Sequence, residues 1–130
     1  MAGTPEGKIK KLVRDVLNEF SESLHVGSYV VTTLKQYWPV PSGMGESDLD
    51  CIVCYYGKYI AIETKAPGKK PTPRQEFCIA RTQGASGMVF VIDDEKGVFE
   101  LRVALQGIKD ANDSERKAQA YRGARQPGGN

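Results

Sequence analysis

Two apolar segments separated by a short turn constrain the fold of this chain more than any other feature. Residues 49–56 and 59–64 are rich in β-branched, aromatic and other apolar side chains, which is typical of strands. Gly57-Lys58 between them predicts a two-residue hairpin turn. The strands are therefore expected to be antiparallel neighbours, which brings Asp50, at the start of the first, close to Glu63, at the end of the second.

The flanking segments predict an α/β domain around this hairpin. Thr4-Pro5 and Thr72-Pro73 each place a capping residue before a proline, so each is expected to begin a helix. The expected elements are a helix at 5–20, strands at 28–38, 49–56 and 59–64, a helix at 73–83, a strand at 88–92 and a weaker helix at 98–108. This order, α-β-β-β-α-β, predicts a mixed sheet flanked by helices.

Length and composition set the limits of the domain. The chain has 130 residues, the size of one domain, which we expect to occupy residues 1–109. Residues 110–130 contain no Ile, Leu, Val, Phe or Met, so they are expected to form a polar, disordered tail. Neither a secretion signal nor a membrane-length apolar run is found, and we expect a cytoplasmic protein without membrane contact.

Asp50, Glu63 and Lys65 are the residues most suited to chemistry. Strand alternation places the side chains of Glu63 and Lys65 on one face and that of Thr64 on the other. Two adjacent carboxylates repel each other, and a divalent cation relieves the repulsion. Oxygen ligands favour Mg²⁺ or Mn²⁺, with the backbone carbonyl of Thr64 as a further ligand. Such a site suits metal-assisted phosphodiester hydrolysis, in which Lys65 orients the water or neutralises charge on the phosphate.

Glu6 has two interpretations. It precedes Ile9 by three residues and Val13 by seven, so it lies on the core-facing stripe of the first helix and can add a metal ligand. Alternatively, it is an acidic residue in a first helical turn, where it complements the helix dipole.

The segment from Lys58 to Arg81 is locally basic, with six basic and two acidic residues. Three of these basic residues, Lys69, Lys70 and Arg74, follow the Glu63–Lys65 pair and are candidates for holding DNA phosphates. The alternative is a solvated loop whose charges have no specific partner.

Three motifs resemble the VRR-NUC branch of the PD-(D/E)XK nucleases, a restriction-endonuclease-like family. They are GMGESDLD at 43–50, YIAIETKAP at 59–67 and PTPRQ at 71–75. The chain is most similar to the small stand-alone members encoded by bacteriophages, and the resemblance spans about residues 4–92. It implies a metal site formed by Glu6, Asp50, Glu63 and Lys65, with Gln75 positioning the substrate or supporting the site.

One position in the first motif departs from the family pattern. The family usually has Pro before the motif Asp, whereas this chain has Leu49-Asp50 and also Ser47-Asp48. Asp50 is the first choice as metal ligand because it directly precedes the apolar run that begins at Cys51, and Asp48 is the second choice.

The resemblance implies a Mg²⁺- or Mn²⁺-dependent DNA endonuclease, in the host cytoplasm if the gene is carried by a phage. We expect selection of branched or junction DNA, since no base-reading module is found. A homodimer carrying two active sites is expected by the same analogy. Three alternatives are a non-catalytic nucleic-acid-binding accessory domain, an interaction domain in which Glu63 and Lys65 form an ordinary ion pair, and a sequence-specific nuclease of the restriction type.

Overall fold

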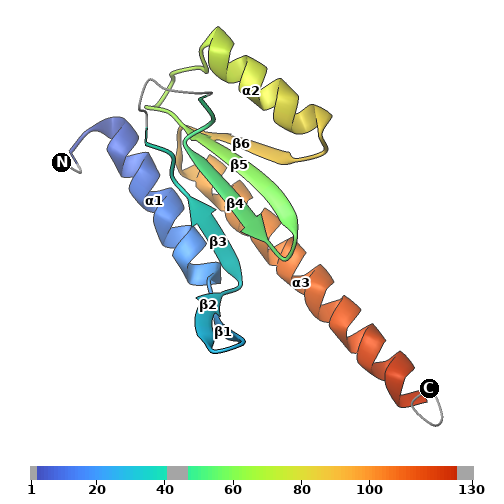
Figure 1. The fold of residues 1–130 in the computed structure, drawn as a ribbon. Coiled ribbons are helices and arrows are strands. Elements are labelled where there is room, and N and C mark those ends of the chain that lie inside the picture. The colour runs from blue at the N-terminus through green and yellow to red at the C-terminus, as the bar shows by residue number, and fades with distance from the viewer. Residues whose placement is uncertain (1–2, 41–46, 126–130) are drawn as a thin grey trace.

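Within the described part of the chain, the fold is mixed α/β, with three helices, a four-stranded mixed sheet and a separate two-stranded ribbon. The structure is a computed structural model, and it describes residues 3–40 and 47–125. The elements are α1 (Pro5–Phe20), β1 (Ser23–Val26), β2 (Tyr29–Thr32), β3 (Leu34–Tyr37), β4 (Cys51–Tyr55), β5 (Lys58–Thr64), α2 (Pro73–Gly84), β6 (Met88–Ile92) and α3 (Glu95–Arg125) (Figure 1). The predicted α/β class and mixed sheet are confirmed.

Helix α1 begins and ends where its sequence pattern predicts. The Thr4 hydroxyl accepts a hydrogen bond from the Gly7 N–H at 2.9 Å, and Pro5 occupies the first turn. The buried face of the helix consists of Ile9, Val13, Val16, Leu17 and Phe20. This apolar stripe packs on the sheet and on α3, so it provides one wall of the core.

The predicted strand at 28–38 is wrong in its extent. The chain instead forms the β1–β2 hairpin and then β3, with Gly27 at a φ of 59° in the turn between β1 and β2. Glycine adopts this left-handed conformation without a steric penalty, which permits a tight turn between Val26 and Tyr29. Only the last part of the predicted strand therefore belongs to the main sheet.

The main sheet has the strand order β3-β4-β5-β6, antiparallel except for the parallel pair β5–β6. The two-residue turn between β4 and β5 is Tyr56-Gly57, not the predicted Gly57-Lys58, because Tyr55 pairs with Lys58. Both turn residues have positive φ, 47° and 80°. The Tyr56 ring packs on the Tyr55 ring with centroids 4.6 Å apart, which supports the left-handed conformation of Tyr56.

Helices cover the two faces of this sheet unequally. α1 and α3 lie together on one face, where they enclose the core (Figure 1). α2 lies over the other face and contacts β6. The core side of β5 consists of Ile60 and Ile62, whereas Ala61 and Glu63 face the side of α2.

The predicted tail at 110–130 is polar, but the expectation of disorder is wrong for residues 110–125, which continue α3 as helix. Val98, Leu101 and Leu105 anchor the first part of α3 in the core, so the costly nucleation step is already complete. The continuation is rich in Ala, Gln, Glu, Lys and Arg, which favour helix without burial, and Gln119 donates to Glu115 at 3.2 Å one turn away. Residues 126–130 lie outside the described residues.

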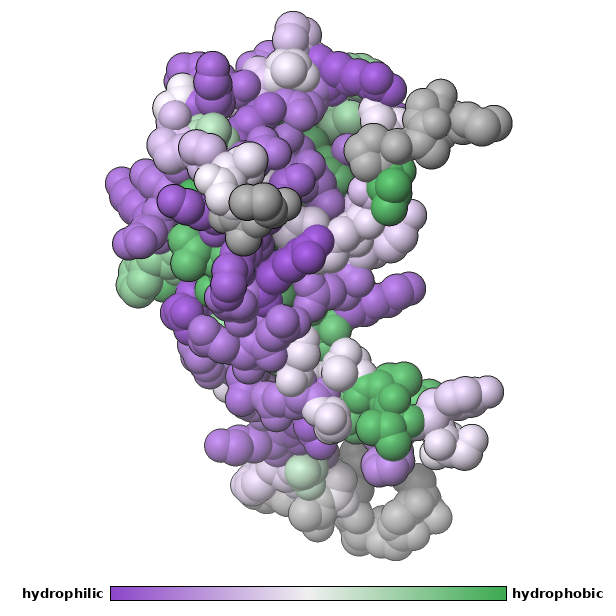
Figure 2. Space-filling view, turned by 90° about the vertical axis from the view of Figure 1, so that its left-hand side faces the viewer, coloured by the Kyte–Doolittle hydropathy of each residue, from purple (hydrophilic) through white to green (hydrophobic). Residues whose placement is uncertain are grey.

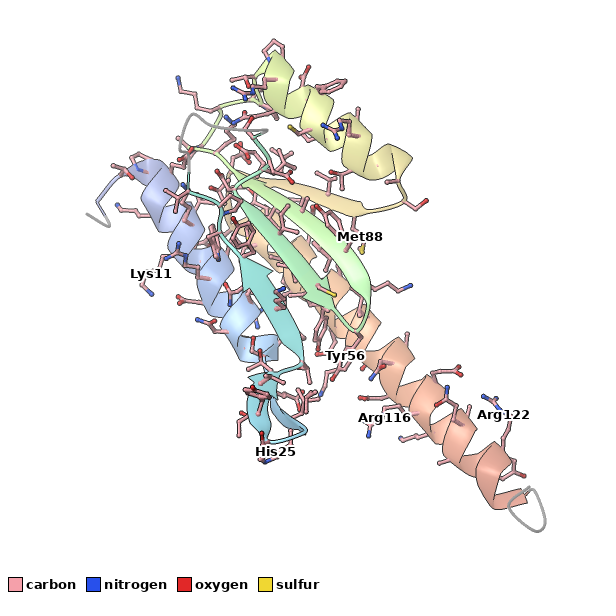
Figure 3. All side chains as sticks on the ribbon, in the orientation of Figure 1. Lys11, His25, Tyr56, Met88, Arg116 and Arg122 are labelled. Carbon is pink, nitrogen blue, oxygen red and sulfur yellow. The ribbon has the colours of Figure 1, made fainter. Side chains whose placement is uncertain are left out.

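The distal part of α3 extends beyond the sheet, and Arg116 and Arg122 lie on it (Figure 3). Among the described residues, no helix combines the length and the apolar character that a membrane span requires.

Candidate functional site

The β4–β5 hairpin places Asp50 opposite Glu63. Cys51 pairs with Ile62 in the register, so the next residues outward, Asp50 and Glu63, face each other at the end of the two strands. The backbone N–H of Asp50 donates to Glu63 Oε1 at 3.2 Å. The structure therefore brings together Asp50 and Glu63, the two acidic residues that the sequence pattern predicts to be close.

Thr64 holds the carboxylate of Asp50. The Asp50 Oδ2 accepts from the Thr64 N–H at 2.9 Å and from the Thr64 hydroxyl at 2.7 Å. The sequence predicts only that the Thr64 side chain faces away from Glu63 and Lys65, and its hydroxyl contact with the Asp50 carboxylate is a further contact that the structure shows. The N–H and C=O of one strand residue point to the same side, so the Thr64 carbonyl also points toward Asp50.

Glu63 is the buried carboxylate at the centre of this arrangement, with 3% of its surface exposed. Burial, followed by the negative charge of Asp50, raises the pKa of Glu63 to about 7. Lys65, whose Nζ lies 3.7 Å from Glu63 Oε2, acts in the opposite direction and favours the charged form. The ionisation of the Glu63 carboxyl group therefore depends on the positive charge beside it, which Lys65 supplies.

Gln75 contacts Glu63 from the first turn of α2. Its Nε2 donates to Glu63 Oε2 at 2.8 Å, while its Oε1 accepts from the Thr72 N–H at 3.0 Å. Thr72 and Gln75 form a reciprocal capping box, so the helix cap fixes the orientation of the Gln75 amide. Thr72 is not among the site residues that the sequence predicts. Thr followed three residues later by Gln is nevertheless the sequence pattern of a capping box.

Glu6 lies near the site but points to another partner. It is half-buried in the first turn of α1, and its Oε2 lies 3.6 Å from Lys10 Nζ. Its negative charge nevertheless contributes to the raised pKa of Glu63. Both interpretations of Glu6 therefore stay open. Its negative charge complements the dipole at the start of α1, and it is close enough to Glu63 to raise the pKa of that residue.

Asp48, the second-choice ligand, has a different environment from that of Asp50. It is exposed, and its Oδ1 accepts from the N–H of its own neighbour Leu49 at 2.8 Å. Its charge contributes to a raised pKa of Tyr59, after the larger effect of burial. These contacts favour Asp50 as the carboxylate associated with Glu63.

Of the three basic candidates, Lys69 and Lys70 lie in the connection between β5 and α2, and Arg74 lies in the first turn of α2. Lys69, Lys70 and Arg74 are all exposed. The turn before them is fixed by two hydrogen bonds, from the Lys69 N–H to the Ala66 carbonyl at 3.0 Å and from the Gly68 N–H to Asp93 Oδ2 at 3.1 Å. Residues 43–46 of the first motif lie outside the described residues.

The donor set fits a hard divalent cation in part. Asp50, Glu63 and the Thr64 carbonyl offer oxygen ligands, the type that Mg²⁺ and Mn²⁺ prefer. A cation here would also favour the ionised form of Glu63. Within the described part of the chain, however, no group of three or more Asp, Glu, His or Cys side chains is arranged to hold a metal ion. The carboxylates are instead held by Thr64, Gln75 and Lys65.

The sequence matches no protein-family model, and no curated protein matches it. The function proposed below therefore depends on the residues and geometry of this site.

Proposed function

We propose that this protein is a Mg²⁺- or Mn²⁺-dependent DNA endonuclease with a PD-(D/E)XK core. The observation that carries the proposal is the meeting of Asp50 and Glu63 across two strands, with Lys65 Nζ 3.7 Å from Glu63 Oε2. The strand order and the placement of α1 and α2 on opposite faces of the sheet are compatible with that core.

Each residue has a role that follows from its contacts. Asp50, Glu63 and the Thr64 carbonyl would hold the cation, and Glu6 would join them by turning away from Lys10. The cation supplies Lewis-acid polarisation of the scissile phosphate. Lys65 orients the attacking water or neutralises charge that develops on the phosphate. Gln75 positions Glu63, and Lys69, Lys70 and Arg74 contact the DNA backbone.

Branched or junction DNA is the proposed substrate class. Backbone contacts by exposed lysines and arginines carry no sequence information, so selection has to come from the shape of the DNA. A sequence-specific nuclease would instead need side chains that reach base edges in the major groove.

The test uses labelled linear, nicked, flap and four-way junction DNA with Mg²⁺, with Mn²⁺ and with EDTA. Lys65→Ala is the loss-of-function variant, and Lys58→Ala, at the exposed beginning of the same strand, is its matched control. We expect metal-dependent cleavage that Lys65→Ala abolishes and Lys58→Ala retains. Equal cleavage by both variants, or none by the wild-type protein on any substrate, contradicts the proposal.

A non-catalytic nucleic-acid-binding domain is the second candidate, and one observation favours it. The carboxylates of Asp50 and Glu63 are already satisfied by Thr64, Gln75 and Lys65 without a metal. This candidate predicts DNA binding that EDTA leaves unchanged and no cleavage by the wild-type protein. Replacing Lys69, Lys70 and Arg74 together would weaken binding under either candidate, so metal dependence separates the two.

A further inference from the structure

The last part of α3 leaves the fold as an exposed helix. Of the residues that the structure describes, Ile108 is the last one in α3 that packs against the core. From Ser114 to Gly123 the side chains are exposed or half-buried. At 1.5 Å per residue, residues 114–125 extend the helix by about 18 Å. We call residues 114–125 the helical arm.

Positive charge is concentrated at this end of the chain. Residues 116–130 contain no Asp or Glu, and their basic residues are Arg116, Lys117, Arg122 and Arg125. The whole chain has a net charge of only +2, so this segment is far more basic than the rest of the protein. A local excess of positive charge on an exposed helix attracts a polyanion.

The composition of the helical arm excludes the partners that need an apolar surface. It contains no Ile, Leu, Val, Phe or Met, so it has no apolar stripe for a partner helix and no apolar face for a lipid surface. In Figure 2 the apolar side chains gather at the level of the β1–β2 ribbon, and the lower end of the molecule, toward the end of α3, is mainly hydrophilic. Recognition of this arm therefore depends on charge.

The basic side chains of the arm lie on more than one side of the helix. A helix turns by about 100° per residue, so Ala120 and Gly123 share a face. On this spacing Lys117 lies about 90° to one side of their midpoint and Arg122 about 130° to the other. Figure 3 likewise shows Arg116 and Arg122 projecting to different sides of α3. Short side chains between two basic flanks suit a groove that is bordered by negative charge on both sides.

We propose that the helical arm binds in the major groove of a DNA duplex, with Lys117 and Arg122 on the two phosphate backbones that border the groove. The major groove is about 12 Å wide and admits a helix of about 10–12 Å in diameter. Ala120 and Gly123 let the helix backbone approach the floor of the groove. Their side chains offer no hydrogen-bonding group, so these contacts position the duplex without reading its sequence.

The contacts of the two flanking residues leave them available to phosphate. Arg122 lies 3.4 Å from Glu115, and both side chains are about 60% exposed, so this ion pair is weak and a phosphate can replace Glu115. Lys117 is exposed, and within the described part of the chain it forms no ion pair. Binding therefore breaks only one exposed ion pair.

The helical arm is a second site, separate from the candidate site. The Lys65 N–H donates to the Ile92 carbonyl at 2.9 Å, so the start of α3 at Glu95 lies near the candidate site. Lys117 and Arg122 follow Glu95 by about 33 and 40 Å along the helix. If the proposed nuclease function holds, a branched DNA can offer one duplex to each site. Binding at the arm itself involves neither metal nor cleavage.

The test isolates the arm by removing the other basic contacts from the full chain. All proteins in the test carry Lys69→Gln, Lys70→Gln and Arg74→Gln, and we call this protein the background. Fluorescence anisotropy follows binding of a labelled linear duplex of about 16 base pairs in EDTA, at about 50 to 300 mM NaCl. We expect the background to bind this duplex, because the arm is intact.

Lys117→Gln with Arg122→Gln should remove this binding. We expect at least about a tenfold loss of affinity, and a fall of about 1.8 in the slope of log affinity against log salt, since each phosphate contact contributes about 0.9. Lys35→Gln with Lys58→Gln removes the same charge from exposed strand positions and should retain the affinity of the background. Gln favours helix about as well as Lys and Arg, so the arm should stay helical.

Ala120→Pro separates groove binding from attraction to a flexible basic tail. It keeps every charge but interrupts the helix, so we expect a loss as large as that of the Lys117 and Arg122 variant. A double-stranded RNA of the same sequence should bind at least about tenfold more weakly, because its major groove is deep and too narrow for a helix.

Several outcomes would overturn the proposal: no binding of duplex DNA by the background, unchanged binding after loss of Lys117 and Arg122, an equal loss in the Lys35 and Lys58 control, unchanged binding by Ala120→Pro, or equal affinity for RNA. Circular dichroism checks the fold of each variant. If the Gln variant loses helix, Lys117→Ala with Arg122→Ala replaces it. Because no metal is present, failure here leaves the nuclease proposal standing, and failure of cleavage leaves this one standing.

Discussion

Gln75 donates from Nε2 to Oε2 of Glu63 at 2.8 Å, and this hydrogen bond joins the N-terminal turn of α2 to the end of β5. The amide can donate to Glu63 because its oxygen is occupied by the Thr72 N–H at 3.0 Å. A helix cap, which ordinarily stabilises only its own helix, here also orients the buried carboxylate of the candidate site. The position of α2 and the charge state of Glu63 are therefore coupled.

Gln75→Ala should reduce both stability and metal binding. It removes half of the capping box and one hydrogen-bond donor to a buried carboxylate, so we expect a loss of about 1–2 kcal/mol in the free energy of unfolding. Mn²⁺ affinity should fall roughly tenfold, as for other residues that orient a ligand. Urea unfolding and Mn²⁺ titration followed by electron paramagnetic resonance measure the two effects. Gln83→Ala, in the last turn of the same helix, is the control and should change neither.

The buried Glu63 should make the metal-free protein less stable as pH rises. Its pKa is about 7 in the folded chain against an ordinary value of 4.5, so the folded state holds this proton more tightly than the unfolded state. The stabilisation is complete below pH 4.5 and is lost as pH rises through 7, a change of about 3 kcal/mol.

Urea unfolding in EDTA at a series of pH values measures this change as a difference between wild type and Glu63→Gln. The variant should be the more stable protein at pH 8 and should lose the steep dependence between pH 5 and 7. Glu100→Gln, at an exposed position of α3, should follow the wild type. A wild-type protein that becomes no less stable relative to Glu63→Gln between pH 5 and pH 8 would refute the prediction.

Asp50 and Asp48 should differ clearly in their effect on metal binding. Asp50→Asn removes one carboxylate charge from the pair with Glu63, so we expect Mn²⁺ affinity to fall more than about tenfold. Asp48→Asn alters an exposed side chain that contacts its own neighbour Leu49, and we expect less than a twofold change, about 0.4 kcal/mol. Calorimetric titration of Mn²⁺ into each variant separates the two. The reverse order would assign the ligand to Asp48.

Short-range signals account for most of what could be predicted. Thr4-Pro5 and Thr72-Pro73 locate the starts of α1 and α2, because capping depends on residues within one turn. The proximity of Asp50 and Glu63 follows from a hairpin between two apolar strands. The contacts of the site are less predictable, because the hydrogen bonds from Thr64 and Gln75 depend on how the strand end meets α2.

The errors arise where one sequence pattern is compatible with two local backbone conformations. Tyr56-Gly57 and Gly57-Lys58 both place a glycine in a tight turn, and the contact between the Tyr56 and Tyr55 rings accompanies the first. The segment around Gly27 has the composition of a single strand, but the glycine allows the chain to reverse. In neither case does the choice depend on hydrophobic pattern alone.

The distal part of α3 should be helical yet contribute little to the stability of the fold. Ser114 to Gly123 are exposed or half-buried, so their helix depends on backbone propensity and on pairs such as Arg122 with Glu115. A chain ending at Asp113 should lose helical circular dichroism in proportion to the 12 helical residues removed, about 114–125, while its free energy of unfolding changes by less than about 0.5 kcal/mol.

Leu105→Ala, in the packed part of the same helix, is the contrasting variant. Leu105 is fully buried, and its truncation should cost about 2–5 kcal/mol because a cavity replaces its side chain. A large loss of stability on removing residues 114–130 would mean that the distal helix packs on something in solution.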